Sequence, residues 1–138
     1  MAITPSSYEN GLVIEDLTLE TQPSKTWAMQ LDGDRCVGTT DGVNALVQSI
    51  FCMLNTEKGV YSIYPNTYGL QTQDLYGKPA PYIYAVLCDR IRDAIMTDDR
   101  VEDVGNFSYT YSGDSMEISY SVYTNFTDDE IRSAYNVR

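Results

Sequence analysis

Apolar residues recur at two spacings along this chain, and the change of spacing marks its elements. Residues 43–54 have the spacing i, i+3, i+4, i+7, i+8 and i+11 of an amphipathic helix. Asp41, Thr40 or Thr39 can cap its start, and residues 55–59 end it. The apolar stripe consists of Val43, Leu46, Val47, Ile50, Phe51 and Leu54.

A second helical pattern begins near Pro81, since proline suits the first turn of a helix. Between the two helices lies a tyrosine-rich connector, residues 60–78, with Pro65, Gly69 and Gly77 as turn signals. The predicted apolar face of the second helix consists of Ile83, Val86, Leu87, Ile91, Ala94 and Ile95.

An alternating pattern before the first helix predicts a hairpin. Trp27, Met29 and Leu31 alternate with polar or small residues and run into the turn signal Asp32-Gly33-Asp34. A second short strand through Cys36 and Val37 would complete this hairpin, whose register the sequence leaves open.

A longer alternating pattern over residues 106–124 predicts a second hairpin. A two-residue turn at Gly113-Asp114 sets Tyr111 opposite Met116, Tyr109 opposite Ile118 and Phe107 opposite Tyr120. This register places the large side chains on one face and the small polar ones on the other.

The two ends of the chain are less regular. Residues 1–24 carry four acids and no base, and we interpret them as an acidic arm that is loose or docked on a neighbour. Residues 25–126 form the predicted domain, and residues 127–138 a tail. Thr127 to Glu130 resembles a capping box, but residues 131–137 could equally form a short edge strand.

The element order predicts an α+β fold. We expect a small antiparallel or mixed sheet, built from the N- and C-terminal hairpins, with two amphipathic helices packed on one face.

Composition narrows the function classes. The 138 residues carry a net charge of −11, which disfavours binding to nucleic acid. The absence of histidine excludes imidazole bases, and three scattered cysteines lack a fourth partner for zinc. We interpret these cysteines as small buried side chains. No apolar stretch is long enough to cross a membrane.

Three pairs of adjacent acidic residues are candidate calcium ligands. Asp98-Asp99, Glu102-Asp103 and Asp128-Asp129 lack the Asp-x-Asp-x-Asp-Gly spacing, so solvated surface charge is favoured. Gly69 and Gly77 are better explained by turns than by a phosphate site. We expect no metal and no cofactor.

The connector carries a family resemblance. Residues 55–69 read Asn-Thr-Glu-Lys-Gly-Val-Tyr-Ser-Ile-Tyr-Pro-Asn-Thr-Tyr-Gly, and residues 74–78 read Asp-Leu-Tyr-Gly-Lys. With the preceding Trp hairpin and helix, and the following helix and hairpin, this resembles the contractile-tail sheath initiators, once called lysozyme-like baseplate proteins. The likeness runs from about Trp27 to Thr124, closest to the variant in phage-like bacteriocins and Gram-positive myophages.

The resemblance implies a structural role and no enzymatic activity. Family members sit in six copies around the tail tube of a phage or tailocin particle, at the junction of baseplate and sheath. They bind baseplate wedge proteins and the tail sheath protein, whose first ring adds arm strands to an exposed sheet edge. Assembly in the bacterial cytoplasm, without membrane or nucleic-acid contact, is expected.

Two sets of contact residues follow from the resemblance. The wedge contact is predicted at Glu57, Lys58, Tyr61, Tyr64, Tyr68 and Gly69. Glu57 and Lys58 could instead be a solvated helix end, and alternation should leave at least one of the tyrosines structural. Strand addition is predicted at one of the two hairpins, and the C-terminal one is favoured because its outer face is rich in Ser and Thr and it contains no proline. The residues predicted for this edge are Asn106, Ser108, Thr110, Glu117, Ser119, Ser121 and Tyr123.

Two other classes of function stay open. The older family label suggests a cell-wall glycosidase, for which Glu57 and Asp74 are the candidate carboxyl pair. A ligand-binding module is disfavoured because no polar constellation typical of a cleft is evident.

Overall fold

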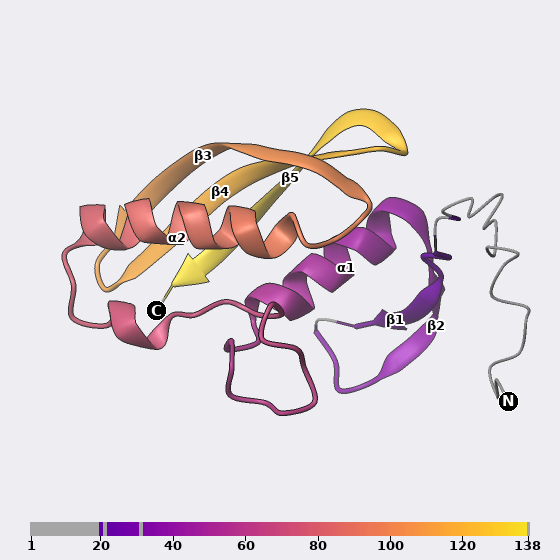
Figure 1. The fold of residues 1–138 in the computed structure, drawn as a ribbon, viewed down its shortest axis with the longest axis horizontal. Helices are drawn as coiled ribbons and strands as arrows, with labels where there is room; N and C mark the ends of the chain where they lie inside the picture. Colours follow the sequence, from indigo (N-terminus) through magenta and orange to yellow (C-terminus); the bar gives the residue numbers. More distant parts are fainter. Residues whose placement is uncertain (1–19, 21, 31, 138) are drawn as a thin grey trace, which may run out of the picture.

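The computed structural model describes residues 20, 22–30 and 32–137, so nearly all of the predicted acidic arm and Leu31 lie outside it. The predicted order of elements is confirmed (Figure 1). The elements are β1 (Thr26–Met29), β2 (Cys36–Thr40), α1 (Gly42–Leu54), a short 3-10 helix η2 (Gln73–Leu75), α2 (Ala80–Ile95), β3 (Val101–Ser112), β4 (Ser115–Thr124) and β5 (Thr127–Val137).

The α+β class is confirmed, but the sheet is built differently from the prediction. The two hairpins do not share one sheet, because β1 and β2 form a separate two-stranded sheet. The main sheet is antiparallel with the order β3-β4-β5, and its third strand is the segment 127–137. The edge-strand alternative for this segment is therefore correct. Strand β5 follows β4 after a two-residue turn, so this pairing closes a very short loop at little entropic cost.

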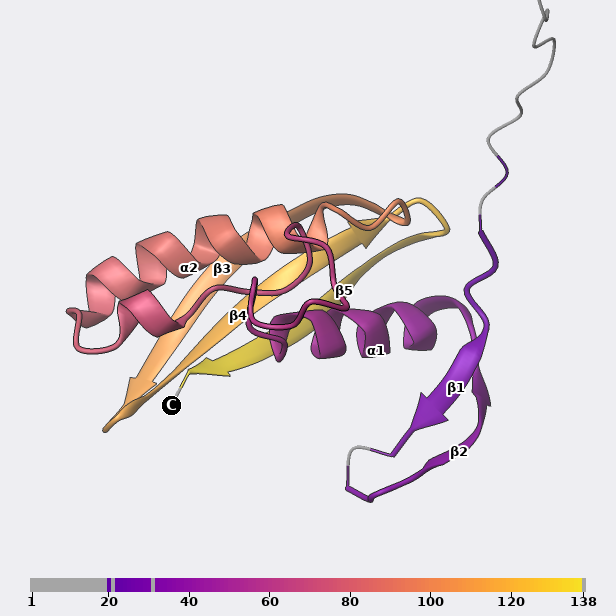
Figure 2. The same ribbon diagram turned by 60° about the horizontal axis from the view of Figure 1, so that its bottom comes forward.

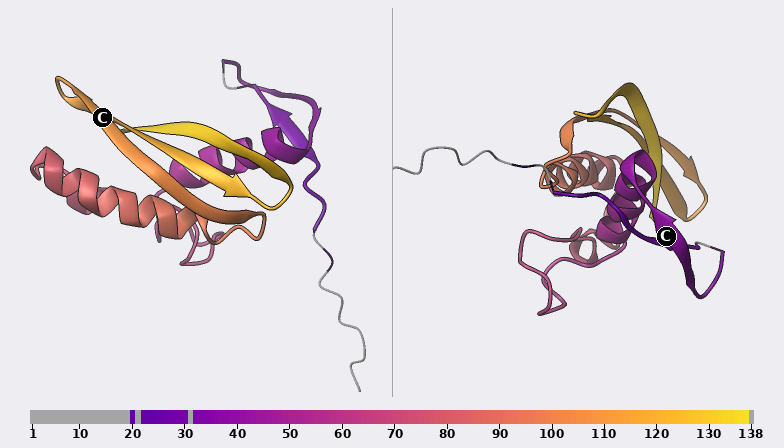
Figure 3. Two further views of the ribbon diagram at one scale, coloured as in Figure 1. Left: turned by 90° about the horizontal axis from the view of Figure 1, so that it is seen from above. Right: turned by 90° about the vertical axis from the view of Figure 1, so that its right-hand side faces the viewer.

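Both helices lie on one face of the main sheet (Figures 2 and 3). The centre of the core is β4, whose alternate residues point at the helices and are almost fully buried. From α2, Leu87, Ile91 and Ile95 meet this face, and from α1, Leu46 and Ile50. The buried residues of β4 are Met116, Ile118, Tyr120 and Val122.

The apolar stripe predicted for α1 is only half covered. Val47 is 37% exposed and Phe51 43% exposed, while Ala45 and Met53 are buried in their place. The cause is the width of the sheet, because α1 packs beside β5, and β5 is the last strand. The cap of α1 is Asp41, whose carboxylate accepts a hydrogen bond of 2.7 Å from the Gly42 backbone N–H.

Two of the three strand pairs predicted in the C-terminal hairpin are confirmed, Tyr111 with Met116 and Tyr109 with Ile118. The pairing of Phe107 with Tyr120 is wrong, because two residues of β3 oppose one residue of β4 at this point. Asn106 takes φ 54°, a left-handed conformation that asparagine tolerates better than most residues. The Phe107 and Tyr120 rings still lie 6.1 Å apart, centroid to centroid.

The N-terminal hairpin stands apart from the main sheet, next to α1 (Figures 1 and 2). Its tie to α1 is the Gln48 side chain, which accepts a hydrogen bond from the Met29 N–H and donates one to the Trp27 carbonyl, both 2.9 Å long. Gln48 thereby imitates the backbone of a neighbouring strand. Trp27 stays 67% exposed, so the hairpin buries little apolar surface.

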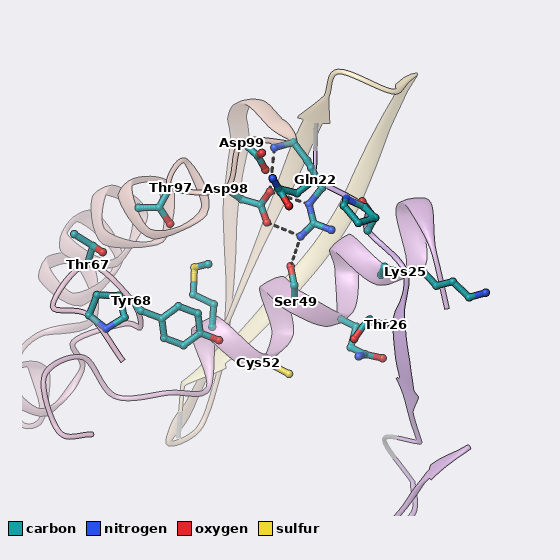
Figure 4. Close-up of a pocket in the computed structure, with 17 residues that line it drawn as sticks. Gln22, Lys25, Thr26, Ser49, Cys52, Thr67, Tyr68, Thr97, Asp98 and Asp99 are labelled. Atoms are coloured by element: carbon teal, nitrogen blue, oxygen red, sulfur yellow. Dashed lines mark hydrogen bonds and ion pairs between the residues drawn. The ribbon is translucent and has the colours of Figure 1, made fainter. Parts of the chain in front are cut away.

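An ion pair fixes the turn between α2 and β3 against α1 (Figure 4). Asp98 and Arg100 are bonded at 2.6 Å with side chains only 10% and 15% exposed, and Arg100 also donates to the Ser49 hydroxyl at 3.1 Å. Burial by itself would raise the pKa of Asp98, but the hydrogen bonds from Arg100 outweigh it and hold this pKa below its ordinary value.

We expect Asp98→Asn to lower the free energy of unfolding by about 3 kcal/mol at neutral pH, because Arg100 then stays half-buried without its counter-charge. A lowered carboxyl pKa stabilises the fold above the unfolded-state value and loses this effect as the pH falls. The gap between wild type and variant should therefore close below about pH 4. Urea denaturation across pH measures this. Asp93→Asn, an exposed carboxylate of α2, is the control and should change stability by no more than about 0.5 kcal/mol.

Candidate partner-binding surfaces

Hydrogen bonds to the Glu57 side chain hold the connector in a closed loop. Its carboxylate accepts hydrogen bonds from the Thr72 backbone N–H at 2.9 Å, the Thr72 hydroxyl at 2.8 Å and the Gln73 N–H at 3.3 Å. All these bonds join the segment just before the connector to residues 72–73 within it. Glu57, predicted as a partner contact, is thus used within the chain itself, which neither the contact nor the solvated-end interpretation foresaw.

The backbone around Gly69 also helps to hold this loop closed. The Leu70 N–H donates to the Thr56 carbonyl at 2.9 Å, and the Lys58 N–H donates to the Leu70 carbonyl at 3.2 Å. Gly69 lies between them with φ 101°, and a Cβ atom there would stand 2.7 Å from the Thr56 carbonyl oxygen. Glycine is therefore required twice at this position, for its conformation and for the close approach of the two backbone segments.

A third tie joins the connector to α2. Arg90 donates two hydrogen bonds to the Asp74 carboxylate, 2.7 and 2.8 Å long, and one of 2.7 Å to the Gln71 carbonyl. Bidentate pairs of this kind are among the stronger side-chain contacts. The connector therefore has a defined shape although it contains little regular structure.

At its tip, this fixed loop presents apolar side chains to solvent. Ile63 is 83% exposed, the highest value among the large exposed apolar residues of the described chain. Tyr64 stacks on Tyr68 with ring centroids 4.5 Å apart, and Tyr68 packs on the core. The expectation that at least one tyrosine is structural is confirmed by Tyr68. We call the exposed group the connector tip; it comprises Val60, Tyr61, Ile63 and Tyr64.

The predicted acceptor hairpin offers only one free edge. Strand β4 lies in the middle of the sheet and pairs with β3 on one side and β5 on the other. Its backbone is therefore closed to an added strand, and this part of the predicted edge is wrong. The β4 residues concerned are Glu117, Ser119, Ser121 and Tyr123.

The remaining predicted residues, Asn106, Ser108 and Thr110, lie on β3, which is an edge strand partly occupied by α2. The Tyr84 hydroxyl donates to the Phe107 carbonyl at 3.1 Å, and the Tyr84 ring lies 4.4 Å from that of Tyr109. The irregular pairing at Asn106 also interrupts the edge, a common protection of exposed strands.

Strand β5 provides the other edge of the main sheet, and no contact was predicted there. In the part of the chain that the structure describes, β5 pairs with β4 alone over eleven residues. A hollow of about 280 Å³ lies between this strand and α1, lined by Val47, Phe51, Leu54, Tyr120 and Tyr135 among others. The signal for this edge was the alternation of Ile131, Ser133, Tyr135 and Val137.

The outer face of the main sheet, which points away from the helices, carries a cluster of polar side chains. The Asn106 amide donates to the Tyr123 hydroxyl at 2.8 Å, and this hydroxyl lies 3.3 Å from the Glu130 carboxylate. The hydrogen bond from Arg132 is the main cause that lowers the pKa of Glu130. These contacts cover Ser121, which is only 4% exposed although it belongs to the outer face.

The chemistry of the connector does not suit the glycosidase alternative. A glycosidase acid needs a raised pKa, whereas the hydrogen bonds from Arg90 lower the pKa of Asp74. Glu57 is committed to Thr72 and Gln73. In the described ranges, no three His, Cys, Asp or Glu side chains are grouped as a metal site would require. No helix of these ranges is long and apolar enough to span a membrane.

We expect Gly69→Ala to lower the free energy of unfolding by about 3 kcal/mol, because it adds a clash with the Thr56 carbonyl to the cost of a left-handed alanine. The comparison variant Gly59→Ala also places an alanine at a positive φ, 78°, but nothing lies within 4 Å of its Cβ. It should lose only about 1 kcal/mol. Urea denaturation compares the two, and equal losses would contradict the role given to the close approach.

Comparisons with known proteins agree with this architecture. The sequence model of the family described as "Contractile injection system sheath initiator" matches residues 23–127. The phage-like element PBSX protein XkdS of Bacillus subtilis (strain 168) is 28% identical over 128 residues, covering 90% of this chain and 89% of that protein. A chain of the cryo-EM structure of the anti-feeding prophage baseplate, 6-fold symmetrised, has the same fold, with a TM-score of 0.55 and 24% identity over 76% of this chain and 88% of that one. The protein therefore belongs to the contractile injection system sheath initiator family.

Proposed function

We propose that this chain acts in the baseplate of a contractile particle and seeds the sheath by accepting a strand of the sheath protein along β5. The observation that carries the proposal is the uncovered flank of α1. Val47 and Phe51 continue the apolar stripe of the helix and stay partly exposed, in a hollow whose other wall is β5, the last strand of the sheet. A fourth strand beside β5 would cover both residues.

The energetics favour such an addition. The free backbone groups of an edge strand supply affinity through ladder hydrogen bonds, and pockets for alternate side chains supply register. An added strand would direct every second side chain toward Val47, Phe51 and Tyr135. Burying an apolar side chain of this size contributes roughly 1.5–3 kcal/mol. The acceptor edge lies almost wholly beyond the family match at residues 23–127, so its assignment depends on the structure of this chain.

The connector tip is proposed as the contact with the baseplate wedge. When a flexible loop binds a partner, the loss of conformational entropy on ordering the loop reduces the affinity. Here Glu57, Gly69 and Arg90 already hold the loop, so little of that cost remains. Of the predicted wedge residues, Lys58, Tyr61 and Tyr64 are exposed and stay in the proposal, whereas Glu57, Tyr68 and Gly69 support them from within the chain.

In this arrangement the two contacts lie on different parts of the molecule, one on the connector and one along β5. Such a chain links the wedge to the sheath without catalysis or a cofactor. Six copies around the tail tube, joined to a particle assembled in the cytoplasm, are part of the same proposal. An acceptor edge repeated around the tube would set the symmetry of the first sheath ring.

We expect the double variant Val47→Asp, Phe51→Asp to reduce sheathed tails by about tenfold or more, because an added strand would have to bury two carboxylates. Both positions are exposed, so the fold should be kept. Electron microscopy of particles from a lysate counts sheathed and bare tubes, and mass spectrometry of the purified particles measures how much variant they carry.

The control for this variant is Tyr109→Asp, Tyr111→Asp on the β3 edge, at residues that are 45% and 58% exposed. If β5 is the acceptor, this control leaves the sheath intact. Bare tubes in the control together with normal sheaths in the α1 variant would move the acceptor edge to β3 and reject our assignment.

A different defect is expected from Tyr61→Ser, Ile63→Ser at the connector tip. This variant removes apolar surface from the proposed wedge contact and should be depleted from purified baseplates by about tenfold. Its circular dichroism and melting temperature should match those of the wild type, since both side chains are exposed. Normal incorporation of the variant into baseplates would eliminate the tip as the wedge contact.

A further inference from the structure

Three sulfur atoms gather where the N-terminal hairpin meets α1. The Cys52 thiol lies 3.5 Å from the Met29 thioether sulfur. Met29 is in turn the direct cross-strand partner of Cys36. Directly opposed residues of an antiparallel pair point to the same face, with Cβ atoms about 4.5–5.5 Å apart. The hairpin therefore presents Cys36 on the same side as Met29, toward the helix that carries Cys52.

This placement differs from the buried cysteines that the sequence suggested. Cys36 is exposed, and Cys52 is only partly buried, at the margin of the hollow drawn in Figure 4. Burial is the main cause that raises the pKa of the Cys52 thiol, and the neighbouring Cys36 raises it further. The second effect requires the two thiols to be near one another, in agreement with the strand register.

We propose that Cys36 and Cys52 are an oxidation site, at which a disulfide forms and fastens the N-terminal hairpin to α1. The Met29 thioether, which lies against the Cys52 thiol in the reduced chain, can turn aside because this side chain has three rotatable bonds. The hairpin needs such a fastening. A two-stranded sheet is marginal by itself, and its polar contacts with α1 include only two hydrogen bonds of Gln48 and the weak contact of the Cys52 thiol with Met29.

A peroxide is the oxidant for this reaction. The exposed Cys36 thiolate attacks hydrogen peroxide, so that a sulfenic acid forms at Cys36 and one water leaves. The Cys52 thiolate then attacks this sulfur, the S–S bond forms, and the sulfenic oxygen leaves as a second water after taking up a proton. Two thiols and one peroxide thus give one disulfide and two waters, and the sulfur pair loses the two electrons that reduce the peroxide.

The test uses the full chain with Cys88→Ser, which leaves the two thiols of interest. Hydrogen peroxide is added to the purified protein, and free thiols are counted before and after. Trypsin provides a direct assay, because the stretch from Cys36 to Lys58 contains no other Lys or Arg. Both cysteines then lie in one peptide, which becomes lighter by two hydrogen atoms on oxidation and returns to its first mass with dithiothreitol.

We expect both thiols to disappear together in a chain that stays monomeric on a non-reducing gel. Amide hydrogen exchange of β1 and β2 should slow by about tenfold or more, because the disulfide closes a short loop across the hairpin contact. Cys36→Ser and Cys52→Ser should each abolish the mass change and the slower exchange. The wild type, which retains Cys88, should behave like the Cys88→Ser chain.

Other products would overturn the inference. Cross-linked dimers would show that Cys36 meets a second copy rather than Cys52. A sulfinic acid at Cys36 beside an unmodified Cys52 would show that the second thiol does not reach the first. A disulfide that forms without slowing exchange in the hairpin would remove the fastening role. None of these results depends on the sheath or wedge contacts.

Discussion

The burial of one face of β4 between the sheet and two helices is the constraint on which the rest of the molecule depends. Met116, Ile118, Tyr120 and Val122 are each at most 3% exposed, and both helices orient toward them. Because both helices pack on the inner face of β4, this strand lies in the centre of the sheet, with β3 and β5 as its neighbours. The helices then extend to the two margins of a sheet only three strands wide.

This width leaves the margins unequal. On the β3 side, Tyr84 of α2 bonds to the strand and the irregular pairing at Asn106 bends it. On the β5 side, α1 lies beside the strand and keeps Val47 and Phe51 in contact with solvent. The domain therefore has a closed core and, at β5, an edge strand that pairs with β4 on one side only.

The connector shows how a loop with little secondary structure can present a defined surface. Its polar residues satisfy one another internally, with Glu57 accepting from Thr72 and Arg90 donating to Asp74. The apolar residues at the tip take no part in these bonds and stay exposed. Motif residues such as Glu57 and Gly69 therefore fix the shape of the loop from within the chain.

Local structure could be predicted from the pattern of residues along the chain. Periodicity predicted both helices, both hairpins and two of three strand pairs, since side-chain alternation and helical spacing are properties of neighbouring residues. The resemblance in the connector predicted the family. Three non-local features became known only from the fold: β5 is the third strand of the sheet, β4 is paired on both sides, and half of the α1 stripe stays uncovered. A stripe of apolar residues indicates which face of a helix is buried in a folded protein. The number of strands beside that face depends on pairing between distant segments, and no local pattern encodes this pairing.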